Sequence, residues 1–259
     1  AVPVKPKNRF KFKTFQQRLD AVDVDSSYRK LKIVKSEPGD GAHTFFQEGL
    51  AQWRELNTAA DFNTLCQEIS SLILTFPLLL HHKEKVFQAL LDRMHMGAAL
   101  SLPATLSLLG ILARDLQGEF MPMLPRYLDR LAELIHSGLD REPEMLENAF
   151  QSMAAVCKQL VKHLSADIAH ALLVTRGLRY SRVEHVRRFA AEVVGYLFRT
   201  APTKLLPGGF ESLLLEYAEE PCSERQEGAG MLVAVTLMGV QHGLHSRLAQ
   251  SLALVLRAP

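Results

Sequence analysis

The sequence predicts an all-α protein, a solenoid of stacked helical hairpins preceded by an extended basic arm. Three observations support this prediction. Apolar residues recur at intervals of three and four through nearly all of the chain beyond residue 41, whereas the alternation typical of half-buried strands is nearly absent. Proline and glycine mark short breaks between these helical segments. One segment also recurs at a nearly constant spacing, as a solenoid requires.

The recurring segment is clearest at residues 183–199. Similar segments start at Thr105, Phe150 and Gly228; with Phe189 as the matching start here, successive starts lie 45, 39 and 39 residues apart. Helical-pair repeats have periods of about 40–47 residues. The order Val-Arg-x-x-Ala-Ala-x-x-x-Gly-x-Leu, which begins at Val186, resembles the second helix of a HEAT repeat. The alternative is one amphipathic helix of an ordinary bundle, and the recurrence argues against it.

The helix boundaries follow from caps and helix-breaking residues. Asp61 is a plausible N-cap, and Pro77 ends one helix or starts the next. The first helices are expected at 43–56, 62–76 and 77–94, with four further pairs after them. Breaks are expected at Pro122/Pro125, Ser137-Gly138, Pro143, Ser165, Tyr180-Ser181, Pro202, Pro207-Gly208-Gly209 and Pro221-Cys222-Ser223.

The core of the solenoid should contain the large apolar residues of the helical stripes. We expect Trp53, Phe150, Phe189 and Leu197 to be buried. Gly195 has no side chain, so a neighbouring helix should approach closely there. The last apolar stretch, 248–257, has no capping residue, and we expect this solenoid to be the N-terminal part of a longer one.

Composition is ordinary for a soluble globular protein, with 47% hydrophobic and 22% charged residues in a chain of 259. The net charge of +2 does not indicate a polyanionic partner for the chain as a whole. Cys66, Cys157 and Cys222 are far apart, which argues against a disulfide framework or a zinc site. The uncharged run 96–113 is as long as a short membrane span, but Ser101 and Pro103 within it indicate a helix start. We therefore expect no membrane association.

Residues 1–41 differ from residues 42–259, the predicted solenoid. Six of the first eighteen residues are basic and none is acidic, and basic and aromatic residues alternate over 9–13. A short helix is expected over 14–20. We interpret residues 1–41 as an arm that is extended or ordered by a partner and that adds no layer to the solenoid. A disordered tail whose charges only solvate it is the alternative.

No pattern of catalytic residues is present. His242 and His245 are spaced to share a helix face, but no third ligand or adjacent acid accompanies them, so we expect no metal. Cys157 lies beside Lys158 on a predicted repeat helix and is expected in the core. We therefore predict no enzymatic activity, no cofactor and no small-molecule substrate.

The candidate sites are instead residues that could contact a protein or an RNA. Arg187 is expected to be structural and to pair with Glu184 or with an acid of a neighbouring repeat, such as Glu142 or Glu144. The expected partner contacts combine the basic and aromatic residues of the arm with arginines near residue 183: Lys5, Lys7, Arg9, Phe10, Lys11, Phe12, Lys13, Arg18, Arg179, Arg182 and Arg188.

Five runs of residues together resemble one family. They are 9–19, 45–57, 112–120, 185–192 and 227–230. In this order they are similar to the N-terminal region of the "down-regulated in metastasis" family of nucleolar HEAT-repeat scaffolds. Trp-Arg-Glu-Leu-Asn and Ala-Arg-Asp-Leu-Gln are the specific parts of the match. Residues 36–41 and 77–104 match poorly, so any contacts that the family makes there do not carry over.

The resemblance implies a non-catalytic scaffold of the small-subunit processome, the 90S pre-ribosome, in the nucleolus. Its implied partners are processome proteins, together with pre-18S rRNA, U3 small nucleolar RNA or both. A generic HEAT adapter for proteins, of the transport-receptor or phosphatase-scaffold type, is the alternative from another functional class.

Overall fold

The computed structural model describes residues 10–24, 44–139, 142–219 and 223–241. All regular secondary structure in these ranges is helical, which confirms the predicted all-α class. Within them, no helix is long and apolar enough to cross a membrane. The α-helices are α1 (Phe15–Asp20), α3 (Phe45–Leu56), α4 (Ala60–Ile69), α5 (Phe76–His81), α6 (Lys83–Leu91), α7 (Leu102–Leu116), α8 (Leu124–His136), α9 (Pro143–Gln159), α10 (Val161–Leu164), α11 (Ile168–Val174), α12 (Arg176–Arg179), α13 (Glu184–Thr200), α14 (Leu206–Glu219) and α15 (Ser223–Gln241).

Short 3₁₀ segments connect several of these helices. They are η1 (Ser70–Leu72), η2 (Met96–Ala98), η3 (Gln117–Met123) and η5 (Thr203–Leu205). Such tighter turns are common where one helix ends and the next begins.

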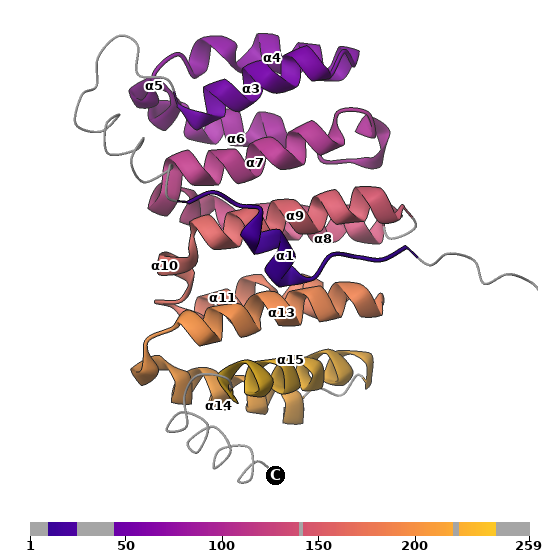
Figure 1. Cartoon of the computed structure of the whole chain (residues 1–259), viewed down its shortest axis with the longest axis vertical. Coiled ribbons are helices and arrows are strands. Elements are labelled where there is room, and N and C mark those ends of the chain that lie inside the picture. Colours follow the sequence, from indigo (N-terminus) through magenta and orange to yellow (C-terminus); the bar gives the residue numbers. More distant parts are fainter. Residues whose placement is uncertain (1–9, 25–43, 140–141, 220–222, 242–259) are drawn as a thin grey trace, which may run out of the picture.

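The helices stack along the long axis of the molecule in two layers (Figure 1). In the front layer, α3, α7, α9, α13 and α15 follow one another, and α4, α6, α8, α11 and α14 lie behind them. The recurring segments found in the sequence lie on the front helices: Thr105 on α7, Phe150 on α9, Phe189 on α13 and Gly228 on α15. The spacing of about 40 residues therefore corresponds to one front helix, the rear helix that follows it and their connections.

Burial agrees with three of the four core predictions. Phe150, Phe189 and Leu197 are buried, with exposed fractions of 2%, 3% and 1%. Trp53 is only partly buried against the core. The reason is its position on α3, which is the first front helix of the described residues and has α7 as its front neighbour among them (Figure 1).

Several predicted boundaries near the N-terminal end are wrong. Ala59 is the N-cap of α4, whereas Asp61 lies in the first turn and accepts a hydrogen bond from the hydroxyl of Ser101. The single helix expected over 77–94 is divided into α5 and α6 at His82. Pro77, by contrast, starts the next helix, which is one of the two predicted outcomes: it lies in the first turn of α5, where its missing N–H is not needed.

The break predicted at Pro207-Gly208-Gly209 is also wrong, because these residues form the first turn of α14. The physical reason is the same as at Pro77: a proline in the first helical turn loses no intrahelical hydrogen bond. The proline therefore marks a helix start and not the gap between two helices.

Small residues allow close approach between helices at two places. A Cβ atom at Gly195 would lie 3.0 Å from Val235 Cγ1, so α13 and α15 nearly touch there, as the sequence predicted. A Cβ atom at Gly228 would lie 2.4 Å from the carbonyl oxygen of Arg179. Only glycine fits at Gly228 unless the backbone of α12 or α15 moves.

The close approach at Gly228 can be tested against a second helical glycine. Gly228→Ala should lower the free energy of unfolding by about 1–3 kcal/mol, because the added methyl group overlaps a backbone oxygen. Gly208→Ala, which has nothing within 4 Å, should raise it by up to about 1 kcal/mol through higher helix propensity. Urea unfolding of both variants measures the difference. Equal effects would show that α15 does not pack on α12 as described.

Candidate partner-binding surface around the N-terminal arm

The arm contains the predicted short helix, and this helix docks on the chain itself. Thr14 accepts a hydrogen bond from the Gln17 N–H, and the Gln17 side chain accepts one from the Thr14 N–H, which fixes the start of α1. The helix lies across α9 and α13 (Figure 1). Phe15 and Leu19, four positions apart on one side of α1, are buried, with exposed fractions of 4% and 3%.

Aromatic rings join the arm to the two helices beneath it. The ring of Phe12 stacks on His185 of α13, with ring centres 4.9 Å apart. Phe15 packs edge-on against Phe189, at 5.8 Å, and against Tyr196, at 5.7 Å. These contacts fix the arm along α13, because edge-to-face and stacked aromatic pairs stabilise beyond the area that they bury.

Arg18 lies at the centre of this contact and is 2% exposed. Its guanidinium carbon is 5.2 Å from the ring centre of Phe150 and 5.3 Å from that of Phe189, within the range of cation–π attraction. A terminal nitrogen also forms an ion pair with Glu147 of α9 at 2.6 Å. The prediction that Arg18 contacts an external partner is therefore wrong, since the residue is enclosed by the chain itself.

Side chains of α9 hold the C-terminal end of α1. Gln151 donates to the carbonyl oxygen of Arg18 at 3.3 Å, and Lys158 donates to those of Leu19 and Val22. The last carbonyls of a helix lack partners within the helix and carry partial negative charge, so a lysine is well suited to this position. Gln159 extends the same contact by donating to the carbonyl of Asp23 at 3.2 Å.

The sequence predicted the short helix of the arm but not its packing. We expected a segment that is extended or ordered by a partner, whereas the buried residues of α1 pack against α9 and α13 of the same chain. The signal was present, because Phe15, Arg18 and Leu19 follow the i, i+3, i+4 spacing of a buried helix face. Lys5, Lys7 and Arg9 lie outside the described residues.

Two further arginines have structural roles. Arg179 is 1% exposed and pairs with Glu216 of α14 at 2.6 Å, so the prediction of an external contact is wrong for this residue as well. Arg187 is structural and pairs with an acid of a neighbouring repeat, as predicted. That acid is Glu227 of α15, at 3.0 Å, and not Glu142 or Glu144 on the preceding side. Each arginine pairs with a glutamate on a later helix of the stack. The two residues of each pair are far apart in the sequence, so their spacing does not predict the contact.

The remaining described candidates are on the outside of the protein. Phe10, Lys11 and Lys13 are exposed on the arm, Arg182 is exposed just before α13, and Arg188 is exposed near its start. Phe12 is the exception, because it is half-buried against His185. Because Phe12 stacks on His185, the arm and the first turns of α13 are held side by side. Five of the predicted contact residues therefore surround one junction.

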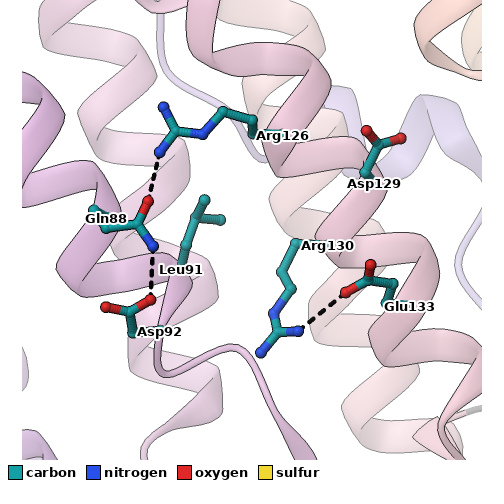
Figure 2. A pocket seen from close by; sticks show the side chains of 7 residues that line it. All are labelled: Gln88, Leu91, Asp92, Arg126, Asp129, Arg130 and Glu133. Carbon is teal, nitrogen blue, oxygen red and sulfur yellow. Dashed lines mark hydrogen bonds and ion pairs between the residues drawn. The ribbon is translucent and has the colours of Figure 1, made fainter.

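A charged cleft of about 400 Å³ lies elsewhere, between α6 and α8. Its polar side chains bind mainly one another (Figure 2): Gln88 accepts from Arg126 and donates to Asp92, and Arg130 pairs with Glu133 at 3.0 Å. Arg126 also pairs with Glu84 at 2.8 Å, beside the cleft. This arrangement is typical of a seam between neighbouring helices.

The groups considered for chemistry lie in the core or outside the described part of the chain. Burial raises the pKa of the Cys157 thiol to about 12, so it remains protonated at neutral pH and is part of the core, as predicted. Cys66 is also buried. In the described ranges, no three His, Cys, Asp or Glu residues are grouped to hold a metal ion. His242, His245 and Cys222 are outside those ranges.

The buried pair of Arg18 and Glu147 can be tested by a double-mutant cycle. Arg18→Met should lower the free energy of unfolding by about 3 kcal/mol, because it leaves a mostly buried carboxylate unpaired. Adding Glu147→Leu should recover part of this loss. The control Lys11→Met changes an exposed cation on the same arm and should have an effect within about 0.5 kcal/mol. If the effects of the first two substitutions simply add, the ion pair does not hold the arm.

Comparison with known proteins gives two relatives that match nearly the whole chain. U3 small nucleolar RNA-associated protein 20 of Saccharomyces cerevisiae is 26% identical over 246 residues, which are 94% of this chain and 10% of that protein. The protein of the same name from Schizosaccharomyces pombe is 24% identical over 236 residues, 90% of this chain and 9% of that protein. The chain thus spans about a tenth of the length of these relatives, and no family model matches it. This chain is homologous to U3 small nucleolar RNA-associated protein 20 along about nine-tenths of its own length.

Proposed function

We propose that this chain is a HEAT-like α-solenoid segment of a non-catalytic scaffold in the small-subunit processome. In this role it would hold pre-rRNA and assembly factors in the nucleolus during maturation of 18S rRNA. The observation that carries the proposal is the homology to U3 small nucleolar RNA-associated protein 20, which extends over nearly the whole chain. The layered helices with their recurring segments support the solenoid assignment.

The runs that suggested the family meet one another in the structure. Asp115, in the run 112–120, accepts a hydrogen bond from the Phe46 N–H at 2.7 Å at the start of α3. The guanidinium of Arg114 lies 3.6 Å from the ring centre of Phe45. These contacts join two of the matched runs across α3 and α7, so the matched residues hold neighbouring helices together.

The same relation holds at the other matched runs. Phe12 of the arm stacks on His185, and Arg187 pairs with Glu227 of the last run. Proteins that share a fold need the same residues at the places where neighbouring helices are joined. The resemblance therefore supports a shared fold most directly, and a shared scaffold role through that fold.

A scaffold role also agrees with the chemistry of the described surface. The cleft between α6 and α8 is lined mainly by polar side chains that bind one another. The buried thiol of Cys157 has a raised pKa and is not poised as a nucleophile. Binding through extended surfaces of stacked helices is the usual mode of such proteins.

Affinity purification of the tagged chain from a nuclear extract, followed by RNA cross-linking, tests the proposed function. We expect enrichment of U3 small nucleolar RNA, pre-18S rRNA and small-subunit assembly proteins. A variant with Phe189→Ala, which should lose roughly 3–5 kcal/mol of stability through a core cavity, controls for dependence on the folded body. Recovery of nuclear-transport or phosphatase subunits in place of pre-ribosomal material would support a generic adapter and contradict the proposal.

A further inference from the structure

We infer that the exposed side of the docked arm and the start of α13, with the residues just before it, form one surface that binds single-stranded RNA. The inference rests on the proposed function and names the residues by which the scaffold would hold RNA. The surface, called the arm–α13 surface below, consists of Phe10, Lys11, Lys13, Arg182 and Arg188.

The side of the arm that packs on α13 determines which arm residues are left exposed beside that helix. Phe12 stacks on His185 at 4.9 Å, so its neighbours Lys11 and Lys13 are held near the first turn of α13. Both lysines are exposed. Arg188 follows His185 by three positions, and residues at this spacing share one side of a helix. Cations from two segments that are far apart in sequence are therefore placed around one contact.

These cations are largely available to a ligand. Within the described residues, Lys11, Lys13 and Arg182 form no ion pair. Arg188 has a side chain 70% exposed, and its closest carboxylate, on Glu192, is 3.8 Å away. Exposed cations without close partners neutralise phosphate at little cost, because no internal ion pair must be broken.

The acids of this region do not cancel the positive charge. Glu192 accepts a hydrogen bond from the Phe15 N–H at 3.3 Å, so one of its oxygens is used to hold the arm. Glu184 is the exposed acid on the first turn of α13. Four cations thus face two carboxylates, in a chain whose total net charge is only +2.

Phe10 adds a second type of contact. Its side chain is 43% exposed, and its ring lies edge-on to Phe12 with ring centres 5.0 Å apart, which supports it from below. An exposed, supported ring beside cations can stack on an unpaired base, and such stacking is tolerant of sequence. This combination favours a single strand over a duplex, whose bases are already stacked on one another.

Salt dependence of binding to a fluorescent twelve-nucleotide oligouridine, measured by anisotropy with the full chain, tests the inference. Four phosphate contacts on a single strand predict a log–log slope near −3, so that the affinity falls about fifty-fold between roughly 50 and 200 mM salt. Lys11→Ala with Lys13→Ala, or Arg182→Ala with Arg188→Ala, should each reduce the slope by about 1.4. Phe10→Ala should weaken binding without changing the slope.

Lys85→Ala with Lys204→Ala is the matched control, because it removes two exposed lysines from other parts of the molecule. This variant should bind like the parent. Equal slopes for the control and the arm–α13 variants, or no binding by the parent at about 50 mM salt, would overturn the inference. Neither result would contradict the proposed function, which is tested by recovery of pre-ribosomal particles. Unchanged melting of each variant shows that loss of binding does not come from unfolding.

Discussion

The contact on which the arm and the middle of the stack depend is the stacking of Phe150 on Phe189, with ring centres 4.1 Å apart. Phe150 belongs to α9 and Phe189 to α13, and these helices touch less than α7 touches α9 or α13 touches α15. The helix α1 lies across this junction and contacts both helices (Figure 1). Arg18 lies over both rings, so one side chain joins the arm to two neighbouring helices of the front layer.

Buried arginines paired with glutamates recur along the stack. Arg18 pairs with Glu147, Arg179 with Glu216 and Arg187 with Glu227, in each case between different helices. A buried ion pair need not stabilise more than a well-packed apolar pair would. It does specify which helix faces which, because an unpaired buried charge in any other arrangement is costly. These pairs therefore contribute to the order in which the helices pack along the stack.

The sequence predicted what depends on local periodicity. The helical class, the recurrence at about 40 residues and the burial of Phe150 and Phe189 all follow from spacing along the chain. Sequence reasoning gave the wrong exposure where a segment far away in the sequence packs against a residue. Glu147, Gln151 and Lys158 form a polar stripe on α9 that is typical of a solvent-facing side, yet this stripe receives α1.

Charge was the least reliable guide to the candidate surface. Arg18 and Lys13 lie five positions apart in the same basic arm, but the first is buried against Glu147 and the second is exposed. Only the fold decides between these two outcomes, because both residues have the same sign and similar neighbours in the sequence. The structure thus divides the predicted basic residues into those that hold the arm and those that remain for a partner.

Hydrogen exchange of the α1 backbone amides, measured by mass spectrometry on the isolated chain, tests the central claim most directly. If α1 is part of the folded body, the amides that bond within it, from about residue 18 to residue 22, should be protected to a degree comparable with the middle of α9. Arg18→Met should reduce protection in α1 more than in α15, which lies on the far side of α13. Exchange of α1 at the rate of an unstructured peptide in the parent chain would contradict the account.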